Sequence, residues 1–276
     1  MFVKNVPLND GTTIPQLGLG TYRLDDDSAE RVVAEALEVG YRHIDTASLY
    51  GNEVGVGRAI AASGIARDEL YITTKCWNSE QPEARAALGR SLDRLGLDHV
   101  DMYLIHWPAP ERGTFVAAWK EFENLKADGL TTSIGVSNFM VDHLDAIAAV
   151  SDVVPALNQV ELHPLLQQNE LRAVHAERGI ATESWGPLGH GNVDLSVELP
   201  ALSQLAERYG KTPQQIVLRW HIQEGNIIFP KTSQRERLVE NISIWDFEIA
   251  EHDMDEIRGF NRDERIGAHP LDGNWD

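Results

Sequence analysis

The chain has 276 residues and a formal net charge of −19, from 24 basic and 43 acidic side chains. This acidity repels nucleic acid and anionic membrane surfaces, so we expect neither as a partner. One cysteine, Cys76, excludes an internal disulfide framework, and no run approaches the roughly 18 apolar residues that span a bilayer, so we expect a cytoplasmic protein.

The first elements in chain order are a hairpin and a series of short strands. The turn signal "LNDGTT", residues 8–13, predicts an N-terminal β-hairpin. Eight strand-like runs follow, at residues 16–21, 41–46, 70–75, 100–107, 132–138, 156–162, 180–186 and 226–231.

Helical patterns lie between these strands. In residues 28–40, we expect Ser28 to cap a helix that Gly40 ends. In residues 212–225, Thr212 is the expected cap, Pro213 fits the first turn and Gly225 ends the helix. Three more patterns of the same kind cover residues 82–96, 115–129 and 169–179.

Strands that alternate with helices indicate a parallel sheet, and eight such units are the number that closes a barrel. The rival is an open doubly wound sheet, which usually carries G-x-G-x-x-G after an early strand. The nearest candidate, "GLGTYR", lacks the third glycine. We therefore predict an α/β fold, a (β/α)8 TIM barrel with an N-terminal β-hairpin, in which residues 1–276 form a single domain.

In such a barrel the functional residues lie where the strands end. Ionisable, amide or aromatic side chains stand at nearly every predicted strand end, more than chance would place there. They are Thr21 and Tyr22, Asp45, Lys75, His106 and Trp107, Ser137 and Asn138, Glu161 and His163, Trp185, and Lys231.

Three of these positions, together with a tyrosine on a neighbouring loop, suggest a proton donor. Asp45, Lys75 and His106 follow strands two, three and four, and Tyr50 lies on the loop after strand two. A lysine ammonium beside a phenol stabilises the phenolate, so we expect Lys75 to lower the pKa of Tyr50. Asp45 would supply the counter-charge that a buried ammonium needs, and His106 would face the same oxygen. The product is a general acid for an oxygen that becomes negative.

Three residues nearby have plainer interpretations. His43 and Asp45 could suggest a metal pair, but no third ligand has a suitable spacing, so we predict no metal site. His163 is expected to be a structural histidine at a strand end. Cys76 adjoins Lys75, but neighbours on a strand point to opposite faces, so an inert buried thiol is expected.

The sequence resembles the aldo-keto reductase superfamily, and most closely its bacterial 2,5-diketo-D-gluconic acid reductase and prostaglandin F synthase group. The resemblance rests on the segments "LGLGTY", "GYRHIDTASLYGNE", "ITTKCWN", "DMYLIHWP", "SIGVSNF", "NQVELHP", "ESWGPLG" and "FPKTSQRERLVEN", in this order along essentially the whole chain. It implies an oxidoreductase that moves a hydride between NADPH and a carbonyl carbon. Asp45, Tyr50, Lys75 and His106 fall on the family's catalytic tetrad, with Tyr50 as the proton donor.

The resemblance also implies a cofactor site. Ser137, Asn138 and Gln159 suit the nicotinamide carboxamide, and Trp185 offers a flat face to the nicotinamide ring. The lysine, hydroxyl and arginine side chains of "KTSQRER", at the start of a helix, suit a phosphate. The full predicted cofactor set is Gly20, Thr21, Tyr22, Ser137, Asn138, Gln159, Trp185, Gly186, Pro187, Leu188, Gly189, Lys231, Thr232, Ser233, Arg237, Glu240 and Asn241.

One departure concerns cofactor choice, because Gln234 stands where close relatives often carry arginine. We therefore expect NADPH to be preferred, with some use of NADH remaining. For the substrate, a small carbonyl compound, the predicted contacts are Tyr22, Trp77, His106 and Trp107. His190 and the tail, residues 266–276, are expected to approach the same pocket.

Two alternatives stay open at this point. The same fold could oxidise an alcohol with NAD, or it could serve as a cofactor-sensing regulatory subunit that binds without turnover. The intact tetrad argues against pure binding. No exposed apolar stripe is evident in the sequence, so we expect a monomer.

Overall fold

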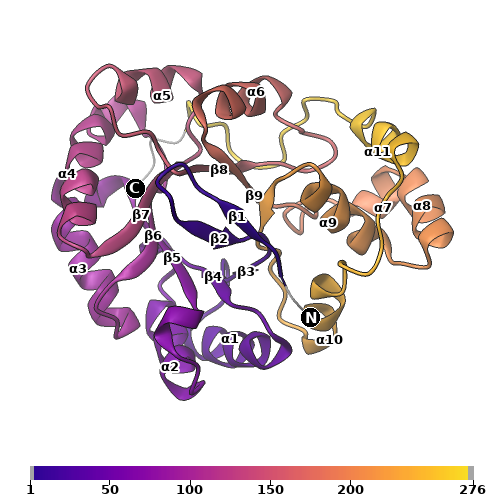
Figure 1. Ribbon diagram of the computed structural model, residues 1–276, viewed down its shortest axis with the longest axis horizontal. Helices are drawn as coiled ribbons and strands as arrows, with labels where there is room; N and C mark the ends of the chain where they lie inside the picture. The colour runs from indigo at the N-terminus through magenta and orange to yellow at the C-terminus, as the bar shows by residue number, and fades with distance from the viewer. Residues whose placement is uncertain (1–2, 273–276) are drawn as a thin grey trace.

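A computed structural model of the chain describes residues 3–272 (Figure 1). Its centre is a ring of parallel strands, and the helices surround this ring. The strands of the ring are β3 (Leu19–Gly20), β4 (His43–Asp45), β5 (Tyr71–Cys76), β6 (Val100–Ile105), β7 (Thr131–Ser137), β8 (Leu157–Glu161), β9 (Ala181–Trp185) and β10 (Ile227–Ile228).

The strands follow chain order around the ring, from β3 to β10. The ring is closed beside β3 and β10. The N–H of Gly18 donates to the carbonyl oxygen of Ile228 at 2.8 Å, and the N–H of Ile228 donates to the carbonyl oxygen of Gln16 at 3.0 Å. The predicted (β/α)8 barrel is therefore confirmed, with one short parallel strand in each of the eight expected places.

The predicted hairpin is also confirmed. Strands β1 (Asn5–Pro7) and β2 (Thr13–Pro15) pair antiparallel, with Val6 opposite Ile14. Figure 1 shows the hairpin across the middle of the barrel. Ile14 packs in one apolar cluster with Met102 and Leu157, side chains near the starts of β6 and β8. The hairpin thus covers the end of the barrel where the strands begin, and the opposite end is left for a site.

Helices cover the outside of the ring. Between the helices and the strands lies an apolar core that is larger than the cluster under the hairpin. They are α1 (Asp26–Val39), α2 (Glu53–Ala62), α3 (Ala84–Leu95), α4 (Phe115–Ala127), α5 (Val141–Ala148), α6 (Asn169–Arg178), α7 (Leu195–Glu198), α8 (Ala201–Tyr209), α9 (Pro213–Gln223), α10 (Arg235–Ile242) and α11 (Glu251–Arg258). Among the described residues, no helix is long and apolar enough to cross a membrane.

The helix caps follow the sequence in one case and depart from it in another. Thr212 caps α9 as predicted, accepting a hydrogen bond from the backbone N–H of Gln215. The predicted cap at Ser28 is wrong. Asp25 caps α1, because its carboxylate accepts from the N–H of Ser28 at 2.8 Å, and Ser28 already lies inside the helix. Both residue types are good caps, so pattern alone did not choose between them.

Candidate active site

A cavity of about 480 Å³ lies at the end of the barrel where the strands finish. Most of the residues predicted for a site line it. They are Asp45, Tyr50 and His106 of the expected catalytic group; Trp77 and Trp107 of the expected walls; and Gly20, Tyr22, Ser137, Asn138, Gln159, Trp185, Gly186, Pro187, Leu188, Lys231, Thr232, Ser233 and Arg237 of the expected cofactor set.

A buried ion pair lies under the floor of the cavity. Lys75, on β5, and Asp45, on the neighbouring β4, are 0% and 1% exposed, and Lys75 Nζ lies 2.6 Å from Asp45 Oδ1. The ammonium also donates to the carbonyl oxygen of Thr46 at 2.8 Å. Burial acts to lower the pKa of Lys75, but the charges of Asp45 and Tyr50 outweigh it and raise that pKa. Lys75 is therefore a fixed cation, with the counter-charge that the sequence predicted.

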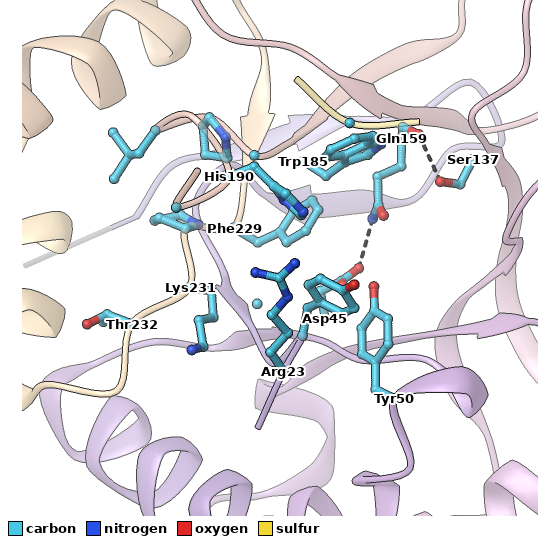
Figure 2. A pocket seen from close by; sticks show the side chains of 18 of the residues that line it. Arg23, Asp45, Tyr50, Ser137, Gln159, Trp185, His190, Phe229, Lys231 and Thr232 are labelled. Carbon is cyan, nitrogen blue, oxygen red and sulfur yellow. Dashed lines mark hydrogen bonds between the residues drawn. The ribbon is translucent and has the colours of Figure 1, made fainter. Parts of the chain in front are cut away.

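The third contact of this ammonium is the phenol of Tyr50. Tyr50 ends a short 3₁₀ turn, Ser48–Tyr50, and its hydroxyl lies 3.4 Å from Lys75 Nζ. Figure 2 shows the Tyr50 ring standing over the floor, with its hydroxyl toward the cavity centre. The phenol and the cation therefore lie together, as expected.

Lys75 lowers the pKa of Tyr50 as predicted, but this effect does not set the direction of the net shift. Burial raises the pKa of Tyr50 to about 12, and the nearby Lys75 offsets only part of that rise while Asp45 adds to it. The sequence argument included the charge of Lys75 but not the desolvation of the phenol itself. In this state of the protein, Tyr50 is a firmly protonated acid at neutral pH.

His106 completes the group from the end of β6. Its ring lies edge-on to the ring of Tyr50 with centroids 5.6 Å apart, and edge-on to Trp77 at 5.1 Å. Burial and the charge of Lys75 hold the pKa of His106 well below its usual range. The imidazole is therefore neutral, and it can donate one hydrogen bond without adding a second charge beside Lys75.

A hydrogen-bonded frame holds the indole of Trp185 at the side of the cavity. Trp185 Nε1 donates to Asn138 Oδ1 at 2.8 Å, and Asn138 Nδ2 donates to Ser137 Oγ and to the carbonyl oxygen of His106, each at 3.0 Å. Ser137 Oγ in turn donates to the carbonyl oxygen of Gln159 (Figure 2). The N–H groups of Asn138 are thus already committed. What Asn138 Oδ1 still offers a ligand is a lone pair, which suits an N–H donor such as that of a carboxamide.

Cations gather at the rim beside the start of α10. Lys231, Ser233 and Arg237 are exposed, and Thr232 Oγ1 accepts from the N–H of Gln234 at 3.1 Å, which shapes the turn into the helix. Neither Lys231 nor Arg237 pairs with a carboxylate in the part of the chain that the structure describes. Two unpaired cations at a helix N-terminus form a favourable place for an anion.

Four predicted cofactor residues lie outside the cavity. Thr21 is fully buried and donates its hydroxyl to the carbonyl oxygen of Asp45. The carboxylate of Glu240 already accepts a hydrogen bond from the hydroxyl of Thr212 at 2.6 Å. Asn241 is buried in α10, and Gly189 forms a tight turn where an added Cβ would lie 2.5 Å from the carbonyl oxygen of Val193. Their predicted contacts therefore rest on the resemblance alone.

Other residues reach the cavity without having been predicted. Arg23 follows Tyr22 with a positive φ of 62°, and Figure 2 shows its guanidinium directed into the cavity. Leu49, Phe229 and Pro230 also line it. Arg23 had a usable signal, because it stands one residue beyond a strand end that was already selected.

The loop of residues 186–191 covers one side of the cavity. His190 stacks on Tyr22 with centroids 5.7 Å apart and planes 20° apart, and it meets Trp185 edge-on at 5.3 Å. The expectation that His190 approaches the pocket is confirmed. Tyr22 is 39% exposed, so this contact lies at the mouth and not in the floor.

The C-terminal segment also reaches the cavity, through Gly267 and Ala268. Glu161, at the end of β8, accepts from the N–H groups of Ile266 at 2.6 Å and Gly267 at 3.0 Å. Gly267 packs against Trp185 so closely that a Cβ there would lie 2.4 Å from the indole. The predicted approach of the tail is confirmed for Gly267 and Ala268, and residues 273–276 lie outside the described residues.

The residues given plainer interpretations, Cys76, His163 and His43, do not line the cavity. Cys76 is fully buried, and burial raises the pKa of its thiol to about 12, as expected for an inert thiol. His163 lies behind the site and hydrogen-bonds Glu161 at 3.1 Å. His43 lies 3.2 Å from the hydroxyl of Thr73, inside the barrel.

With this geometry established, the chain can be compared with known proteins. Residues 16–262 match the model of the Aldo/keto reductase family. An aldo-keto reductase of Mycobacterium sp. (strain KMS) is 49% identical over 272 residues, 98% of each chain. The methylglyoxal reductase DkgA of Salmonella typhimurium (strain LT2) is 44% identical over 265 residues, 96% of each chain. A crystal structure of a Gox0644 mutant in complex with NADPH has a TM-score of 0.92 at 41% identity and covers 98% of both chains.

Proposed function

Since this chain belongs to the aldo/keto reductase family of oxidoreductases, we propose that it reduces small carbonyl compounds to alcohols with NADPH. One observation carries the proposal. A protonated phenol and a buried cation lie at the floor of a cavity whose rim carries Lys231 and Arg237, in a chain with a net charge of −19. An anionic cofactor would bind at that rim, with its reactive end toward Tyr50.

Tyr50 is the proposed proton donor. The carbonyl oxygen of a bound substrate would lie near the Tyr50 hydroxyl and the neutral His106, which can donate a hydrogen bond to it. As the oxygen becomes an alkoxide, a far stronger base than a phenolate, it takes the phenol proton even from a group with a pKa of about 12. The phenolate left behind is stabilised by Lys75, 3.4 Å away.

The residues present fit a nicotinamide dinucleotide. The frame around Trp185 offers a flat ring face, and Asn138 Oδ1 offers an acceptor to a carboxamide. Lys231, Ser233 and Arg237 offer charge-assisted hydrogen bonds to a 2′-phosphate, which NADPH carries and NADH does not. When bound, NADPH supplies the hydride that no side chain can deliver.

The walls of the cavity favour a compact substrate. Trp77 and Trp107 are nearly buried and stand on the side of His106, which leaves room for a small flat carbonyl group beside Tyr50. Arg23 adds a cation that suits a carboxylate or a second carbonyl oxygen. A relative that bears the name methylglyoxal reductase supports a small dicarbonyl compound as the first substrate to test.

The test follows NADPH absorbance with a panel that contains methylglyoxal, a simple aldehyde, a ketone and a keto-sugar acid. Parallel rates with NADH at equal concentration separate reduction with NADPH from an NAD-linked enzyme. We expect turnover with at least one small carbonyl and a higher specificity constant for NADPH. Tight NADPH binding without turnover of any of these carbonyls would favour the sensing role instead.

A further inference from the structure

A carboxyl group with no assigned role lies inside the barrel beneath the cavity. Glu183, on β9, is 0% exposed and points into the barrel two residues before Trp185. It is the register partner of Gln159 on β8. Glu183 Oε2 accepts from Gln159 Nε2 at 2.8 Å, whereas Glu183 Oε1 has no hydrogen-bond partner among the described residues.

The same nitrogen of Gln159 donates a hydrogen bond to a second carboxyl group. Gln159 Nε2 also donates to Asp45 Oδ2 at 2.8 Å, a bond drawn in Figure 2. A primary amide has two N–H donors, and here both are directed at carboxyl oxygens of opposite strands. This arrangement fixes which end of the amide is nitrogen, because a carbonyl oxygen 2.8 Å from the Asp45 carboxylate would be repelled.

We propose that Glu183 is a positioning residue, which together with Asp45 holds the Gln159 amide with its nitrogen toward the barrel and its oxygen toward the cofactor. This inference rests on the proposed function. Without Glu183, one N–H would lose its partner, and the amide could rotate to present a donor where the carboxamide of the cofactor needs an acceptor.

Glu183 makes this contact as a neutral acid. The polar groups around Glu183 lie on three strands: Asp45 and His43 on β4, Lys75 and Tyr71 on β5, and Gln159 on β8. On β10, the residue paired with Glu183 is the apolar Ile227. Lys75 is the one cation in this group, and it is already bound to Asp45. A second buried carboxylate would lack a counter-charge. Burial and the charge of Asp45 accordingly raise the pKa of Glu183 to about 8.

The protonation of Glu183 matters for the acid at the cavity floor. If Glu183 ionised, its negative charge would strengthen the hold of Lys75 on its own proton and oppose formation of the Tyr50 phenolate. Glu183 therefore contributes in two ways, by orienting Gln159 and by leaving the charge of Lys75 free to act on Tyr50. The ionisation of Glu183 at alkaline pH should slow reduction.

The experiment compares the wild type with Glu183→Gln, which keeps the shape but cannot ionise, and Glu183→Leu, which removes the hydrogen bond. The matched control is Glu207→Gln, the same exchange at an exposed position of α8. The first readout is the Tm of the protein without cofactor as a function of pH. The second is NADPH affinity at pH 7 from a fluorescence titration, and the third is the pH profile of reduction.

The expected direction of the change in Tm with pH follows from the raised pKa of Glu183. The contribution of Glu183 to stability is complete below about pH 4.5, its ordinary pKa, and is lost as pH rises toward about 8. Glu183→Gln should therefore gain Tm relative to the wild type across this window, whereas Glu207→Gln runs parallel to the wild type. Glu183→Leu should bind NADPH about tenfold more weakly, the loss of roughly one hydrogen bond, and Glu183→Gln should bind nearly as well as the wild type.

In the third readout, Glu183→Gln should keep its activity to higher pH than the wild type. The proposal is overturned if Glu183→Leu binds NADPH as tightly as the wild type, or if Glu183→Gln has the wild-type dependence of Tm on pH. If Glu183→Leu does not fold, the proposal is tested by the pH dependence of Tm and of reduction in Glu183→Gln alone. A wild type that reduces no carbonyl would refute the proposed function, but the Tm curves would still test the protonation of Glu183.

Discussion

Replacing Lys75 by methionine should damage stability and catalysis by separable amounts. Lys75 and Asp45 form a pair that is almost completely buried, with 2.6 Å between the charged atoms. Removal of one partner leaves Asp45 as a buried charge whose remaining side-chain contact is Gln159. Breaking such a pair costs about 3–5 kcal/mol in the free energy of unfolding.

The effect on catalysis comes from the contact with Tyr50. Coulomb's law at the 3.4 Å between Lys75 Nζ and the Tyr50 oxygen, with an effective dielectric constant of about 20, gives about 5 kcal/mol for the phenolate. As an upper bound on the lost stabilisation, this corresponds to a fall in kcat of about 10³- to 10⁴-fold. The apparent pKa of any residual reduction should also move upward.

The double variant Lys75→Met with Asp45→Asn separates these effects. Neither buried charge remains, and asparagine can still accept from Gln159, so the free energy of unfolding should return to within about 2 kcal/mol of the wild type. Activity should not return, because the cation beside Tyr50 is still missing. Urea denaturation and single-turnover rates measure the two quantities. If the double variant were as unstable as Lys75→Met, or if Lys75→Met kept the wild-type pH profile, the reasoning would be wrong.

The remaining predictions concern the proposed proton donor, the proposed phosphate site and the tail. Tyr50→Phe should bind NADPH normally but reduce carbonyls about 10²- to 10⁴-fold more slowly, and a loss of less than twofold under chemistry-limited conditions would exclude it as the donor. Arg237→Ala should raise the KM for NADPH about tenfold and leave that for NADH unchanged, whereas Gln234→Arg should widen the preference; equal losses for both cofactors would contradict this assignment. Gly267→Ala should raise the substrate KM, because the new Cβ would lie 2.4 Å from the Trp185 indole and must displace it or the tail; steady-state kinetics with an unchanged KM would argue against that contact.

The sequence predicted the barrel because its signals were local and repeated. Each strand was a short apolar run that ended at a helix signal, and the rules for parallel sheets fix how such units assemble. Once the barrel was predicted, the ends of β4, β5 and β6 had to be neighbours. That alone brought Asp45, Lys75 and His106 together before any distance was known.

What the sequence could not predict depended on depth and on partners from distant segments. The net rise in the pKa of Tyr50 was not predicted, because a sequence shows which charges are near a phenol but not how much water the fold removes from it. The cap at Asp25 depended on a choice between two suitable residues.

Glu183 illustrates the deepest of these limits. It stands in the segment "ESWGPLG", in which residues 185–189 were assigned to the cofactor site but Glu183 was given no role, because a glutamate in a strand is expected to face solvent. Its position inside the barrel follows from the alternation of side chains along β9, in which Glu183 shares the inward face with Trp185. An acidic residue on the inward face of a barrel strand must be neutralised by a cation or keep its proton. Because Lys75 is already bound to Asp45, Glu183 is left to keep its proton, and it is the structure that shows this pairing and the burial of Glu183 beneath the active site.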